Sequence, residues 1–214
     1  MSKQILPEGP IYVAPGMLGQ YENGEPVVED SDSGRSLDPR TLNDKIVIYE
    51  REVKGWFLDP ALRLLESDEQ SSTMNNAFVI VMICMAYFEG VEQYKTGVES
   101  NRRSKECFVD SVKRIYPGRF EKNQIEKFYE QSRCGLFHNG MTKGSVILSY
   151  EYGEALKIEG SGKRMKIKIS PKFLLADVKR DFEAYVNKLR QHDDHPELVR
   201  ENFDRLYSVL PDQQ

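Results

Sequence analysis

The feature that most constrains the fold is an unbroken run of apolar residues over positions 77–88. The run is too short to span a bilayer and too long for an ordinary strand. Three hydroxyl residues at 71–73 precede it and can cap the start of a helix. We therefore predict a helix over residues 74–95, buried at the centre of a helical bundle.

Other segments carry apolar residues at helical spacing, which predicts a mainly α fold. They are residues 44–65, 102–116, 122–137, 171–190 and 196–209. Within the first, Asp59 and Pro60 supply an N-cap and a first-turn proline, so we expect that helix to be bent or broken there.

Two segments lack this spacing. Residues 1–42 hold five prolines, several glycines and an acidic-polar string at 29–34. They predict an irregular N-terminal arm whose apolar residues pack on the body or form a short edge strand. Residues 145–169 hold a short apolar run at 146–148, apolar residues at 156 and 158, and an alternation of apolar and polar side chains at 165–169 after a Gly-Ser-Gly turn. This pattern predicts a small antiparallel β-hairpin or three-stranded sheet. Residues 43–214 are then expected to form one helical domain with this sheet inserted.

Composition narrows the function classes. With 30 basic and 34 acidic residues the net charge is −4, so the chain has no global field that attracts nucleic acid or an anionic membrane. The three cysteines, Cys84, Cys107 and Cys134, fit neither a disulfide framework nor a zinc site. The first ten residues do not resemble a signal peptide, and no phosphate-binding loop or nucleophile elbow is present. We expect a cytoplasmic protein that needs no metal or cofactor and does not associate with membranes.

The most informative chemical motif is Arg133-Cys134-Gly135-Leu136-Phe137-His138-Asn139-Gly140. Arginine stays charged near neutral pH and histidine exchanges protons there, so the pair can bind a phosphate and move protons around it. On a continuous helix, however, His138 would point about 140° away from Arg133. The two can act together if the chain changes path after Gly135, or if the partner side chain comes from a second subunit.

Two other interpretations bear on this motif. In a purely structural role, Arg133 would pair with Glu130 while His138 sits at the helix C-terminus, where a positive imidazole is favoured. A second copy of the spacing, from Arg190 to His195, lies in a polar link between helices and is interpreted as solvated linker.

The order of elements around the motif resembles the HEPN (higher eukaryotes and prokaryotes nucleotide-binding) superfamily over about residues 45–190. An apolar helix contains the residues 88–92, Phe-Glu-Gly-Val-Glu; a shorter helix follows; and the next helix ends in Arg-x-x-x-x-His before Asn139 and Gly140. Family members usually place a small polar residue directly after the arginine, where this chain has Cys134. The resemblance implies a helical bundle that dimerises so that two motifs face one another in a cleft.

In many members of that superfamily the cleft is the active site of a metal-independent endoribonuclease, and the expected type here is a toxin or defence enzyme. By this resemblance, His138 would move protons and Arg133 would hold the phosphate while the RNA 2′-hydroxyl attacks. One chain has a single histidine here, so a homodimer would supply both an acid and a base. Asn139, Glu89 and Tyr129 are the expected substrate-binding or orienting residues, although Asn139 also suits a turn and Tyr129 a core position.

The expected partners are RNA, a second copy of the chain, and an antitoxin or regulatory protein. The alternative is a non-catalytic HEPN-like module that binds RNA, a nucleotide or a protein partner through the same cleft.

Overall fold

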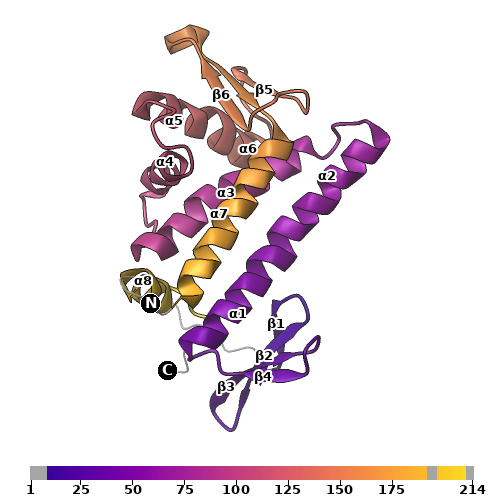
Figure 1. Cartoon of the computed structure of the whole chain (residues 1–214), viewed down its shortest axis with the longest axis vertical. Helices are drawn as coiled ribbons and strands as arrows, with labels where there is room; N and C mark the ends of the chain where they lie inside the picture. Colours follow the sequence, from indigo (N-terminus) through magenta and orange to yellow (C-terminus); the bar gives the residue numbers. More distant parts are fainter. Residues whose placement is uncertain (1–8, 192–196, 211–214) are drawn as a thin grey trace.

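The protein is mainly helical, with two small β-sheets at opposite ends of the bundle (Figure 1). The computed structural model describes residues 9–191 and 197–210. The helical elements are α1 (Leu42–Val53), the π turn η1 (Lys54–Leu58), α2 (Asp59–Ser71), α3 (Ala77–Thr96), α4 (Ser104–Ile115), α5 (Lys122–Phe128), the π turn η2 (Tyr129–Arg133), α6 (Cys134–Asn139), the 3-10 turn η3 (Gly162–Arg164), α7 (Pro171–Arg190) and α8 (Glu197–Leu206). The prediction of a mainly α fold is confirmed.

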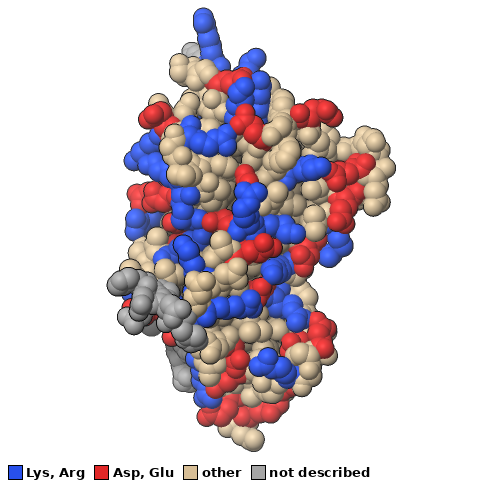
Figure 2. Space-filling model, in the orientation of Figure 1, with Lys and Arg blue, Asp and Glu red and all other residues tan. Residues whose placement is uncertain are grey.

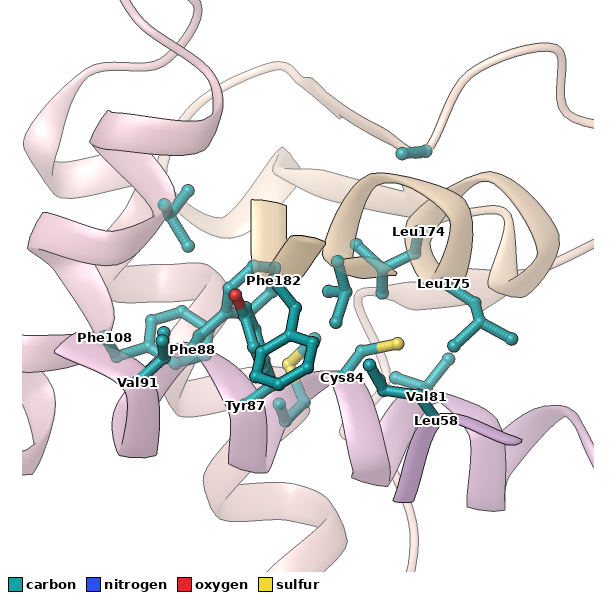
Figure 3. Close-up of a cluster of buried hydrophobic side chains, with 14 of the residues drawn as sticks. Leu58, Val81, Cys84, Tyr87, Phe88, Val91, Phe108, Leu174, Leu175 and Phe182 are labelled. Atoms are coloured by element: carbon teal, nitrogen blue, oxygen red, sulfur yellow. The ribbon is translucent and has the colours of Figure 1, made fainter. Parts of the chain in front are cut away.

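Helix α3 lies at the centre of the bundle, as its apolar run predicts. It packs on α4, α7 and α8, and Figure 3 shows its side chains Cys84 and Phe88 facing Leu174 and Phe182 of α7. In the part of the chain that the structure describes, α3 is the one helix long and apolar enough to cross a membrane, and 44% of its most apolar window is buried within the protein. These contacts are those of a core helix.

The first long helix is not broken at Asp59, so the break that was one of the two predicted alternatives does not occur. α1, η1 and α2 follow one another as a continuous helix over residues 42–71, because the residues at both junctions keep right-handed helical backbone angles. Pro60 has no N–H to donate, and its ring crowds the carbonyl four residues earlier. The wider π turn ends directly before Asp59, whose N–H bonds to the Lys54 carbonyl, and this local widening accommodates the proline.

The prediction of an irregular arm over residues 1–42 is wrong for the residues that the structure describes. Residues 11–37 form an antiparallel sheet in the order β1-β2-β3-β4, with strands Ile11–Ala14, Met17–Glu22, Glu25–Asp30 and Arg35–Leu37. Several of the residues that suggested irregular chain lie in its turns: Asn23 and Gly24 both have positive φ, as a tight hairpin between twisted strands requires.

This N-terminal sheet has its own small core. Apolar side chains from the strands pack against Ile48 of α1 and against Leu210 near the end of the described chain. The buried members from the strands are Val13, Ala14, Met17, Val28 and Leu37. The sheet therefore attaches to the outer face of the first long helix.

The second sheet follows α6 and precedes α7 along the chain, as predicted, but its strands pair in a mixed parallel and antiparallel arrangement. Its order is β5-β7-β6, with strands Val146–Leu148, Lys166–Ile169 and Leu156–Glu159. β6 and β7 form the expected antiparallel hairpin, whereas β5 pairs parallel to β7, so the fully antiparallel prediction is wrong for β5. The fully buried Ile167 and Ile169 explain why β7 takes the central position.

Candidate functional site

The helix that carries the Arg-His motif contains a π turn, η2, which ends at the arginine of the motif. The N–H of Cys134 bonds to the Tyr129 carbonyl, and the carbonyl of Gln131 instead accepts from the N–H of Lys143, at 2.9 Å. The chain after the helix therefore folds back over the helix that it has just left. The side chain of Ser145 reinforces this return by donating to Gln131 Oε1 at 3.1 Å.

Gly135 is needed for this close approach. A Cβ added there would lie 2.8 Å from the Met141 carbonyl oxygen and 3.1 Å from the Lys143 nitrogen. The expectation that Gly135 lets the chain change path is wrong, since α6 continues through Asn139 and ends at Gly140, whose φ is 70°. The glycine makes room for backbone and does not interrupt the helix.

Arg133 is held by Glu89 of α3. Its Nε donates a hydrogen bond to the carboxylate oxygen Oε2 at 3.0 Å, and Nη2 forms an ion pair with the same oxygen at 2.9 Å; the two side chains are only 20% and 16% exposed. The structure thus places Glu89, one of the expected substrate-binding or orienting residues, against the arginine of the motif. The alternative pairing of Arg133 with Glu130 does not occur, because Glu130 instead lies 3.3 Å from the ammonium group of Lys127.

Aromatic rings flank the Arg133 guanidinium. The Phe137 ring centroid lies 4.8 Å from Arg133 Cζ, and the Tyr129 centroid lies 5.7 Å away. Tyr129 also contacts the core ring of Phe108 at 5.2 Å, and burial raises its pKa against the opposing effect of Arg133. Tyr129 is therefore a half-buried wall between the core and the arginine.

His138 does not meet Arg133 within one chain. It lies exposed in the last turn of α6, five residues after the arginine on a continuous helix, so its direction differs from that of Arg133 by about 140°. Phe137, four residues after Arg133, takes the position over the guanidinium, and the i to i+4 spacing was the sequence signal for it. Asn139 ends α6, and its side chain lies outside what the structure describes.

The second Arg-His spacing forms no site in the described chain. Arg190, at the end of α7, pairs with Glu50 of α1. His192 and His195 lie outside the described residues.

Three comparisons with known proteins found no match to this chain. The comparisons found no fitting family model, no similar curated protein and no solved structure with a matching fold. The candidate site is therefore judged from its own geometry.

The geometry favours binding of an anion by a positioned guanidinium. Glu89 occupies one edge of Arg133, and among the described residues Nη1 has no hydrogen-bond partner. That edge can donate to a phosphate oxygen. Residues 9–191 and 197–210 contain no group of three or more His, Cys, Asp and Glu side chains placed to hold a metal ion.

Proposed function

We propose that this protein is a cytoplasmic, HEPN-like, metal-independent endoribonuclease of the toxin or defence type, which cleaves RNA by attack of the 2′-hydroxyl. The observation that carries the proposal is the half-buried Arg133, which pairs with Glu89 along one edge and has no hydrogen-bond partner at Nη1 among the described residues. An oriented guanidinium of this kind stabilises the negative charge that develops on a phosphate during transfer.

The reaction needs an acid and a base besides this cation, because a proton leaves the 2′-hydroxyl and another reaches the departing 5′-oxygen. His138 is the titratable group of the motif, and it is exposed to solvent. Since it points away from Arg133 of its own chain, the site is complete only when a second copy brings its imidazole alongside. We accordingly propose a homodimer.

The surface around His138 suits such a contact. Phe137 and Met141, on either side of it along the chain, are 44% and 56% exposed. Large apolar side chains left in water beside a functional group are typical of an interaction surface. An antitoxin or regulatory protein that covered the same two side chains would block both dimerisation and access of RNA.

The test is cleavage of a labelled single-stranded RNA in the presence of EDTA. Wild-type protein should cut, and both Arg133→Ala and His138→Ala should lose cutting while retaining their thermal unfolding transition within a few degrees. Cutting that survives both substitutions would rule out this site.

Dimerisation is tested separately by light scattering. Met141→Asp should yield a monomer that no longer cuts RNA, because a charge at the contact opposes association. Leu198→Asp is the matched control, since Leu198 is 66% exposed on α8 and should leave both mass and cutting unchanged. A monomeric wild-type protein that cuts RNA would contradict the shared site.

A second candidate function, a non-catalytic module that binds RNA, a nucleotide or a protein partner, is favoured by one observation. Within a single chain, Arg133 is engaged by Glu89 and Phe137 and is not aligned with His138. Basic and acidic side chains are also interspersed over the face in Figure 2, so any RNA contact there would be local. RNA binding that weakens steeply with salt, without EDTA-resistant cutting, would select this function over the nuclease.

A further inference from the structure

A pocket of about 240 Å³ lies between the first long helix and α3. Four of its lining residues are aromatic, Tyr49, Phe57, Tyr87 and Tyr94, and most of the others are aliphatic. Its volume is below the roughly 300–1,000 Å³ typical of sites for drug-sized ligands. It therefore suits a compact chemical group.

One carboxylate, that of Glu52, belongs to this otherwise uncharged lining. It accepts a hydrogen bond from the Tyr207 hydroxyl at 2.7 Å, and no Lys or Arg of the described chain forms an ion pair with it. Burial raises the pKa of Glu52, because removing a carboxylate from water without a counter-charge is unfavourable. A cation in the pocket would supply that missing charge.

The wall formed by the π turn η1 is held in place from outside. Phe57 and Leu58, at the end of this turn, line the pocket. Pro15, in the turn between β1 and β2, packs on Gly55 of the same π turn so closely that an added Cβ would lie 2.5 Å from its ring. The N-terminal sheet thus supports a preformed wall, which lowers the ordering cost of binding, and π turns are frequent at functional sites.

We propose that this pocket binds the alkylammonium group of a small organic cation. Aromatic rings attract such cations through their quadrupoles, and a carboxylate adds a direct counter-charge. Glu52 disfavours an anionic ligand, and a neutral apolar ligand would desolvate the carboxylate further without compensating it. The inference does not depend on the nuclease proposal, because it involves neither Arg133 nor His138.

Trp56 provides a direct reporter of binding. It is the single tryptophan of the chain, lies in η1 beside Phe57 and is 42% exposed. Choline and tetramethylammonium should change its fluorescence saturably, with the same affinities by calorimetry. The neutral shape analogue of choline, 3,3-dimethyl-1-butanol, should bind with an affinity lower by about tenfold or more, because it lacks the cation–π and ionic contacts.

Variants separate a charge effect from a general apolar effect. Glu52→Gln retains an acceptor for Tyr207 and should weaken choline binding about tenfold while leaving the neutral analogue unaffected. Glu66→Gln is the matched control, because it removes the same charge from an exposed position of the same long helix and should change nothing. Phe57→Ala, at a side chain 43% exposed, should weaken both cations without unfolding the protein.

Three results would overturn the proposal. They are no binding of either cation at millimolar concentration, equal affinity for choline and its neutral analogue, and equal weakening by Glu52→Gln and Glu66→Gln. RNA cleavage by each variant is measured in parallel, so that a failure of cation binding can be distinguished from a failure of the nuclease proposal.

Discussion

The ion pair between Arg133 and Glu89 should contribute measurably to stability, and its coupling energy can be worked out from the structure. Nε of Arg133 donates one hydrogen bond to the Glu89 carboxylate at 3.0 Å, Nη2 lies 2.9 Å from the same oxygen, and the side chains are 20% and 16% exposed. Hydrogen bonds to charged groups in such shielded positions contribute about 1.5–3 kcal/mol, whereas exposed ion pairs contribute about 0.2–1 kcal/mol. Since both groups retain some contact with water, we expect a coupling free energy of about 1–2 kcal/mol.

A double-mutant cycle measures this coupling without counting the separate costs of each substitution. Arg133→Met and Glu89→Gln keep most of the side-chain volume, and the free energy of unfolding of each protein comes from urea titration. The control cycle uses Lys172→Met and Glu69→Gln, a pair at 2.7 Å that is 48% and 43% exposed and also joins distant segments. Its coupling should be below about 0.5 kcal/mol.

A coupling energy for Arg133 and Glu89 that is no larger than that of the control pair would contradict this prediction. The carboxylate would then not hold the guanidinium in solution, and the oriented phosphate-binding edge on which the nuclease proposal depends would be lost. Coupling near the expected value, together with cleavage by wild type and not by Arg133→Ala, would support both steps.

Two further predictions concern the helical glycines and the buried carboxylate. Gly135→Ala should destabilise the protein by about 1–3 kcal/mol, because the added Cβ would lie 2.8 Å from the Met141 carbonyl oxygen. Gly90→Ala is the control and should stabilise the protein by about 0.5–1 kcal/mol, because no atom lies within 4 Å of its added Cβ. Similar urea midpoints for the two variants would contradict the close approach of the loop to Gly135. Because the pKa of Glu52 is raised in the folded protein, its contribution to the free energy of unfolding is complete below the ordinary pKa of 4.5 and is lost as pH rises through the folded-state pKa. Glu52→Gln should therefore gain stability relative to wild type between about pH 4 and pH 7. A stability difference between the two proteins that does not change with pH would show that the carboxylate is not desolvated.

Local sequence signals located the helices well, because helical periodicity and end signals act over a few residues. The central helix, the helix over residues 171–190 and the sheet after the motif all lie where these signals indicate. The N-terminal sheet was missed because its short strands are separated by Pro, Gly and Asn, and their stabilising contacts come from Ile48 and Leu210, far away in the sequence. The parallel pairing of β5 with β7 could not be predicted from neighbouring residues either, because it depends on which strand is buried against the helical bundle.

For the candidate site, the sequence by itself determined which chemical groups are present and that Phe137, four residues after Arg133, shares its helix face. Only the tertiary structure decided that Glu89, and not Glu130, pairs with the guanidinium, and that Gly135 accommodates a returning loop instead of ending the helix. The pocket around Glu52 also exists only in three dimensions, because α1, η1 and α3 each contribute part of its wall. A residue's identity and helical phase follow from its neighbours along the chain, whereas burial, counter-charge and close approach depend on segments that folding brings together.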